Sequence, residues 1–186
     1  MSIFELFILA IGLSMDAFAV SICKGLSLGK IKKRHMLTAG AWFGGFQALM
    51  PLIGYFLGSF FAEMITKYAH WIAFALLMYL GINMYKESRE KECDEMDASM
   101  KAKEMFILAV ATSIDALAVG VTFAFLRVQI IPAVSFIGVI TFVCSAIGVK
   151  IGSLFGEKYK SKAEMCGGII LMLIGIKILL DGLGIF

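Results

Sequence analysis

A carboxylate occurs twice in the same apolar setting of this chain. Residues 14–20 read SMDAFAV and residues 113–119 read SIDALAV, which places Asp16 and Asp115 at matching positions of two similar segments. A carboxylate near the centre of a membrane helix costs about 2.5 to 3.5 kcal/mol on insertion scales. Two such residues in matching positions therefore indicate a function, and the chemistry open to them is the binding of a cation or of protons.

The composition predicts that these segments are membrane helices. The 186 residues are 60% hydrophobic and 17% charged, whereas charged residues make up about 25% of a typical soluble domain. Apolar stretches of around 20 residues, enough to cross a hydrocarbon core of about 30 Å, recur along the chain. The sequence therefore predicts an all-α integral membrane protein in contact with the lipid bilayer, and it gives no reason to expect a nucleic-acid partner.

Six apolar segments are expected to span the membrane as two inverted three-helix repeats. The expected helices cover residues 3–25, 36–60, 70–85, 105–126, 131–155 and 164–184. The first repeat covers residues 1–92 and the second residues 105–186, and a charged cytoplasmic linker over 86–104 joins them. Because each half holds an odd number of helices, the second half must lie upside down relative to the first, as in many secondary transporters.

The two halves also correspond outside the aspartate motifs. The second helix of each half contains a GxxxG motif, formed by Gly54 and Gly58 in one and by Gly148 and Gly152 in the other. This motif lets membrane helices approach closely. We therefore expect the second helix of each half to pack tightly against a neighbouring helix.

Basic residues predict the orientation in the membrane, because they accumulate in cytoplasmic loops. The loops after the first, third and fifth helices hold most of them: Lys24, Lys30, Lys32, Lys33, Arg34, Lys86, Arg89, Lys91, Lys101, Lys103, Lys158, Lys160 and Lys162. The opposite loops hold Lys67 and Arg127. Both termini are therefore expected outside the cytoplasm.

Helical spacing places each aspartate on a face of small residues and predicts a lipid-facing stripe of bulky residues on another face. The stripes are Ile11, Met15, Phe18 and Ile22 in the first helix and Val110, Ile114, Leu117 and Val121 in the fourth. Asp16 and Asp115 should thus point into the bundle near the middle of the membrane. Two carboxylates that face one another in a dry site cannot both stay ionised without a cation.

Further oxygen ligands are predicted near these aspartates. Gln47 lies four residues before Pro51, which frees the Gln47 backbone carbonyl from its usual helical bond. Asn83 in the third helix and the hydroxyl groups of Ser14, Ser113 and Thr112 complete the candidate set. Such ligands suit Mn²⁺, Mg²⁺ and Ca²⁺, whereas a copper or zinc site would recruit Cys or His.

Structural alternatives remain open for the same residues. Each aspartate could hydrogen-bond neighbouring hydroxyl groups or pair with one of the intramembrane lysines, Lys150 and Lys177. Gln47 could make an interhelical hydrogen bond and nothing more. An exporter of an amino acid or small organic cation, or a membrane protein that transports nothing, are the alternative functions. An enzyme is not expected, because no His or nucleophile accompanies the two aspartates, and no resident cofactor is expected.

The paired motifs and residues 43–54, which read FGGFQALMPLIG, resemble the bacterial manganese efflux pump family, the MntP-like proteins. The resemblance runs from end to end of the chain. It implies a multi-pass protein of the bacterial plasma (inner) membrane that exports Mn²⁺ from the cytoplasm, with a fold like that of the lysine-exporter superfamily. Asp16 and Asp115 match the family's motif aspartates, and Gln47 stands where some members carry Glu.

The sequence also limits the energy source for such export. It contains no Walker A motif, so the chain itself is not expected to hydrolyse ATP. Moving two positive charges outward against an inside-negative potential costs about 4.6 kcal/mol per 100 mV. A counterflow of protons would meet this requirement, so the partners expected from the sequence are Mn²⁺ as transported substrate and protons as counter-ions.

Overall fold

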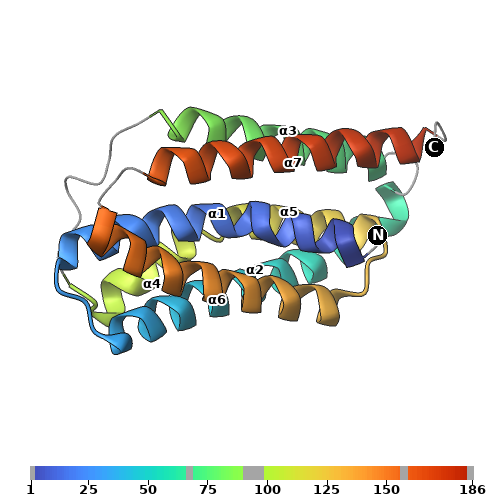
Figure 1. Ribbon diagram of the computed structural model, residues 1–186. Coiled ribbons are helices and arrows are strands. Elements are labelled where there is room, and N and C mark those ends of the chain that lie inside the picture. The colour runs from blue at the N-terminus through green and yellow to red at the C-terminus, as the bar shows by residue number, and fades with distance from the viewer. Residues whose placement is uncertain (1–2, 66–68, 90–98, 156–158, 184–186) are drawn as a thin grey trace.

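The computed structural model describes residues 3–65, 69–89, 99–155 and 159–183, and the regular structure in these ranges is entirely α-helical. The helices are α1 (Ile3–Leu28), α2 (Lys33–Ile65), α3 (Ala69–Glu87), α4 (Ala102–Ala111), α5 (Ile114–Phe125), α6 (Ile130–Phe155) and α7 (Lys160–Gly182) (Figure 1). Residues 90–98 of the linker expected over 86–104 lie outside the described residues.

Several of these helices can cross a membrane. Among the described residues, α1, α2 as far as Phe60, α6 and α7 are long and apolar enough to do so alone. Helices α4 and α5 pass the same test as a pair, bent by 46° at their junction. Helix α3, with 19 residues, is not among these candidates. The chain is therefore an all-α protein with four or five candidate membrane spans by this measure.

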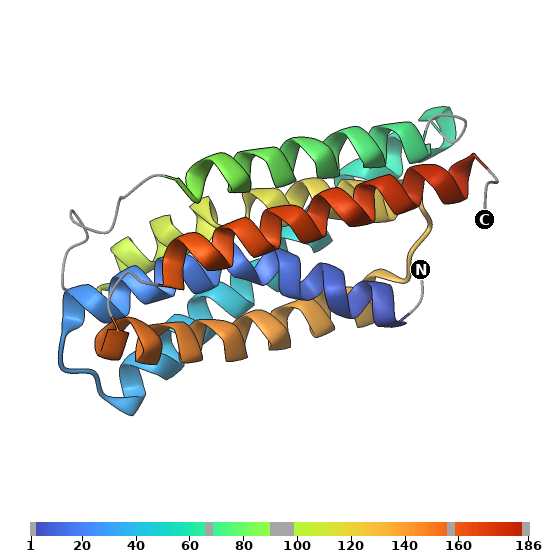
Figure 2. The same cartoon turned by 45° about the horizontal axis from the view of Figure 1, so that its top comes forward.

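The helices lie along a common axis, as both ribbon views show (Figures 1 and 2). Helix α1 begins and α7 ends at the same end of the bundle. Helix α1 packs chiefly against α6 and α7, α2 packs against α5 and α6, and α3 packs against α7. Contact between α1 and α2, which are neighbours in sequence, is slight. The main contacts thus join the first half of the chain to the second.

Glycines permit the closest of these contacts. A Cβ atom at Gly54 of α2 would overlap the backbone carbonyl of Leu117 in α5, and one at Gly152 of α6 would overlap the carbonyl of Ile22 in α1. The expectation that the GxxxG glycines allow close packing is confirmed. Each motif lies against the helix that carries the aspartate of the other half.

The fourth expected span is broken. The sequence analysis expected one helix over 105–126, but the structure has α4 and α5 with Thr112 and Ser113 between them. The Thr112 hydroxyl donates to the carbonyl of Leu108 at 3.0 Å, and the Ser113 hydroxyl donates to the carbonyl of Ala109. Hydroxyl groups that bond the backbone in this way compete with the helix and bend it.

The expected lipid-facing stripe is wrong in α1. Ile22 is fully buried, because α6 packs over it at Gly152. Met15 is only partly exposed, and its Cβ would lie 2.7 Å from a Cβ built at Gly167 of α7. In α5 the stripe holds at Ile114, whose side chain is 61% exposed. Helix α1 therefore lies deeper in the bundle than its sequence indicated, with partners on several sides.

Candidate functional site

The aspartates of the two motifs line one cavity. The cavity has a volume of about 410 Å³ and lies between α1, α3, α7 and the junction of α4 with α5. Besides the exposed Tyr79, its polar side chains are Asp16, Asn83, Thr112, Asp115 and Glu164. Carboxylate, carboxamide and hydroxyl oxygens thus meet in one space that four separate parts of the chain build.

Asp16 enters the cavity from the middle of α1, whose 26 residues run from Ile3 to Leu28. Its side chain is partly exposed. Immediately before it, the Gln47 amide Nε2 donates to the carbonyl of Leu13 at 3.0 Å, and the hydroxyl groups of Ser14 and Thr141 lie 2.8 Å apart. Helices α2 and α6 therefore hold α1 at the turn that leads to Asp16.

Asp115 enters from the first turn of α5, just after the break in the helix. Its side chain is 7% exposed. The start of a helix carries a partial positive charge that favours a nearby carboxylate, and broken membrane helices are a common source of ion ligands in transporters. Thr112 adds its hydroxyl from the break itself. The break thus places a carboxylate and a hydroxyl side by side on the cavity wall.

Three of the predicted ligands lie away from the cavity wall. Gln47 and Ser14 are fully buried and contribute to the contacts between α1, α2 and α6. Ser113 is also fully buried, and its hydroxyl bonds the carbonyl of Ala109. None of the three lines the cavity. Gln47 therefore makes the interhelical bond that the sequence analysis held open, and no described residue bonds its Oε1 atom.

Glu164 is a cavity residue that the sequence analysis missed. It is 6% exposed and comes from α7, one turn after the helix begins at Lys160. In the sequence it stands at the start of an apolar segment, beside basic residues, where an interfacial position is the ordinary interpretation. The available signal was the pair Gly167 and Gly168 one turn later, because adjacent glycines in a membrane helix indicate close packing on that side.

The five polar side chains do not form a ready-made metal cage. Among the described residues, no group of three or more His, Cys, Asp or Glu side chains is arranged so that it could hold a metal ion. A hydrated ion needs no such cage. Six water molecules at about 30 Å³ each occupy about 180 Å³, and the cavity of about 410 Å³ has room for a divalent cation with its water shell.

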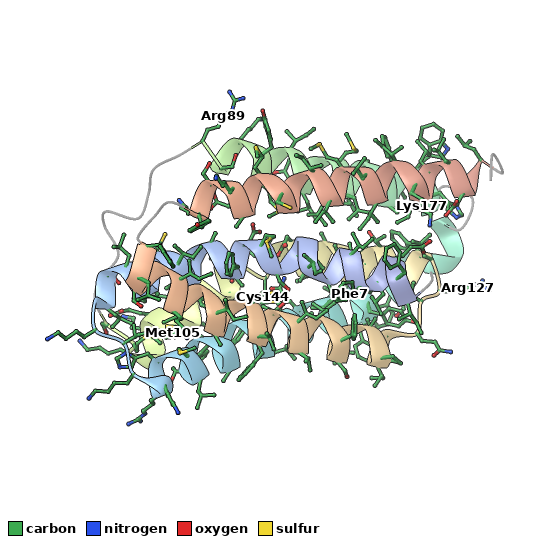
Figure 3. The ribbon with its side chains drawn as sticks, viewed as in Figure 1. Phe7, Arg89, Met105, Arg127, Cys144 and Lys177 are labelled. Carbon is green, nitrogen blue, oxygen red and sulfur yellow. The ribbon has the colours of Figure 1, made fainter. Side chains whose placement is uncertain are left out.

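The intramembrane lysines lie elsewhere. Lys177 forms an ion pair with Glu5 near the end of the bundle where α1 begins (Figure 3). Lys150 is exposed and lines a different pocket together with Lys32 and Lys33. Neither lysine lines the cavity that contains the two aspartates.

Comparisons with known proteins point in one direction. A family model described as "Putative manganese efflux pump" matches residues 30–179. A protein of Acetivibrio thermocellus named "Putative manganese efflux pump MntP" is 59% identical over all of this chain and 94% of its own length. Proteins of the same name from Desulfitobacterium hafniense and Campylobacter jejuni are 59% and 52% identical, over 97% and 98% of this chain and 95% and 98% of their own lengths. No solved structure matches the chain.

Proposed function

The chain belongs to the family described as "Putative manganese efflux pump", and on this premise we propose that it exports Mn²⁺ from the bacterial cytoplasm in exchange for protons. The family and the apolar helices make it a multi-pass membrane protein. The observation that carries the proposal is the meeting of Asp16 and Asp115 in one cavity with Asn83 and Thr112. Oxygen ligands of this kind suit Mn²⁺.

We further propose that the chain is built from two inverted repeats of three spans, with α4 and α5 as one broken span. Corresponding glycines support this arrangement. The carbonyl of Leu117 contacts Gly54, and the carbonyl of Phe18 contacts Gly148. Leu117 and Phe18 are matching positions, each two residues after the motif aspartate, and the two glycines match in the second helices. A twofold relation between the halves explains why both contacts occur.

Two other contacts support the same relation. A Cβ at Gly44 would lie 2.7 Å from the carbonyl oxygen of Gly138, and one at Gly138 would lie 3.0 Å from the carbonyl oxygen of Gly44. These glycines occupy matching positions of α2 and α6, so they contact each other as residues beside a twofold axis would.

We place the cavity on the cytoplasmic side of the protein in this conformation. Asn83 and Glu164 each lie four residues, or about 6 Å, from the end of their helices at Glu87 and Lys160. Both helices stop there, while α1 continues farther in the same direction (Figures 1 and 2). The basic loops predicted to be cytoplasmic follow at this end, and both termini are then outside the cytoplasm.

The transport cycle follows from charge. On the cytoplasmic side, Asp16 and Asp115 bind the cation as carboxylates, so that two negative charges balance two positive ones. After release outside, protons replace the cation and the neutral side chains return. Two protons per Mn²⁺ leave no net charge to move, which avoids the cost of about 4.6 kcal/mol per 100 mV for the bare ion.

The test is manganese content and tolerance in bacterial cells that lack their own exporter. Wild type should lower cellular manganese, whereas Asp16→Asn and Asp115→Asn should leave it at the level of the empty strain at matched membrane expression. Glu5→Gln removes a carboxylate outside the cavity and should export normally. Unchanged export by both aspartate variants would show that Asp16 and Asp115 do not form the transport site. If wild type moves no manganese, the same assay with amino acids tests the alternative substrate.

A further inference from the structure

The cavity contains a third carboxylate. Glu164 is 6% exposed and lines the same space as Asp16 and Asp115. Glutamate is rarely buried to this extent unless it is paired or binds a metal. A cation is therefore expected near the buried Glu164 carboxylate, either a basic side chain of the protein or a bound ion.

Backbone packing fixes Glu164 at this place. One turn farther along α7, a Cβ at Gly168 would lie 2.6 Å from the carbonyl oxygen of Gly81 in α3, and one at Gly167 would lie 2.9 Å from the carbonyl oxygen of Gly12 in α1. Helix α7 thus lies directly against the backbones of α3 and α1. Because Gly12 is one turn before Asp16, Glu164 and Asp16 lie at a similar level of the bundle.

The protein supplies a cation of its own beside Glu164. The Lys160 ammonium Nζ lies 3.9 Å from the Glu164 carboxylate Oε1, and the Lys160 side chain is 12% exposed. This distance is at the outer limit of an ion pair. Lys160 is also the first residue of α7, where its side chain can swing toward water without disturbing the helix.

We propose that Glu164 is a third carboxylate of the cation site and that Lys160 is a tethered cation which a divalent ion displaces from it. The proposal rests on the proposed function, since it assigns the same cavity to the transported ion. With Lys160 beside it, the charge of Glu164 is balanced within α7. When the hydrated divalent cation enters the cavity, the Glu164 carboxylate accepts hydrogen bonds from its water shell, and Lys160 moves toward the cytoplasm.

Under this proposal, replacing Glu164 and replacing Lys160 have opposite effects on the affinity for Mn²⁺. A purely structural ion pair would not produce opposite effects. Mn²⁺ is titrated into the purified full-length protein in detergent, and the unbound ion is measured by electron paramagnetic resonance. Glu164→Gln should weaken binding roughly tenfold or more, as expected for the loss of one charged hydrogen-bond acceptor that faces the hydrated ion. Lys160→Gln should strengthen binding several-fold, because the competitor is gone.

Matched controls come from the Lys177–Glu5 pair, which lies outside the cavity. Glu5→Gln and Lys177→Gln make the same charge changes and should leave the dissociation constant within about twofold. Glu164→Asp keeps the carboxylate and should bind within a few-fold of wild type, which preserves the test if Glu164→Gln does not fold.

The outcomes separate this inference from the function on which it rests. If Asp16→Asn abolishes binding while Glu164→Gln binds like wild type, the third carboxylate is wrong and the aspartate site stands. If Lys160→Gln weakens binding as Glu164→Gln does, the pair is structural and the exchange is wrong. If wild type and Asp16→Asn bind Mn²⁺ equally well, both this inference and the proposed function are wrong.

Discussion

The hydroxyl oxygens of Ser14 and Thr141 lie 2.8 Å apart and join α1 to α6 two residues before Asp16. Ser14 also donates to the carbonyl of Ala10 at 2.6 Å, so Thr141 is its donor in this contact. Both side chains are fully buried. The position of Asp16 in the cavity therefore depends on a bond to the other half of the chain.

Replacing Thr141 with Val should remove this bond while it keeps the shape of the side chain. We expect a loss of about 1 kcal/mol of stability, which is the usual net value of one hydrogen bond. This corresponds to a melting temperature about 2–4 °C lower, measured on the purified protein in detergent. Thr141→Ser retains the hydroxyl and should melt close to wild type. Equal melting temperatures for the Thr141→Val variant and wild type would contradict the stabilising role of the Ser14–Thr141 hydrogen bond.

The contact between α5 and α2 at Gly120 should not tolerate a methyl group. A Cβ at this position would overlap the carbonyl of Pro51, which is backbone and cannot turn aside. Gly120→Ala should therefore cost about 1–3 kcal/mol and reduce the amount of folded protein in the membrane. Gly45→Ala is the control, because a Cβ at Gly45 meets nothing within 4 Å. The prediction fails if the two variants are equally stable.

The ion pair between Lys24 and Glu104 should couple α1 to α4. The Lys24 side chain is 2% exposed and its Nζ lies 3.4 Å from Glu104 Oε2, while Glu104 is 30% exposed. A double-mutant cycle with Lys24→Met and Glu104→Gln should give a coupling of about 1 kcal/mol, reduced by the partial exposure of Glu104. Thermal unfolding of the four proteins measures it. Strictly additive effects would show that the pair contributes nothing.

Exchange of two protons for one Mn²⁺ should be electrically silent. In liposomes that contain the protein, a potassium diffusion potential should leave the rate of Mn²⁺ movement unchanged. A pH gradient of the right direction should raise the rate several-fold, since protons must return for each ion moved. Liposomes with Asp115→Asn protein give the background. An outward current during export would rule out this stoichiometry.

The two aspartates could be identified from the sequence, because a charged side chain in an apolar membrane helix has a high free-energy cost and therefore indicates a function. The glycine contacts were also predictable, since small residues spaced by four mark close helix packing. The break between α4 and α5 was not. Ser14 bonds Ala10 as Ser113 bonds Ala109, yet α1 stays continuous. The two segments differ at the preceding residue, because α1 has Leu13 where the second motif has Thr112, whose hydroxyl also bonds the backbone.

Glu164 and Gln47 show the other limit of the sequence. Glu164 lies near the start of its helix, but α7 begins close to the level of Asp16, so a helix end is also a cavity wall. Gln47 lies in the interior as expected, but its side chain bonds Leu13 and does not reach the cavity. Burial could be inferred for Gln47 from its segment. Whether the Gln47 side chain faces the backbone of α1 or the cavity depends on how α2 is rotated about its axis relative to its neighbours.

The slight contact between α1 and α2 has a consequence for biogenesis. The chief partners of α1, α2 and α3 are α5, α6 and α7, which are synthesised later. A ribosome that has completed the first three helices has delivered a polypeptide without its tertiary partners, with Asp16 and Lys24 already inserted. The tertiary contacts around Asp16 and Lys24 therefore form only after the second half of the chain has been synthesised.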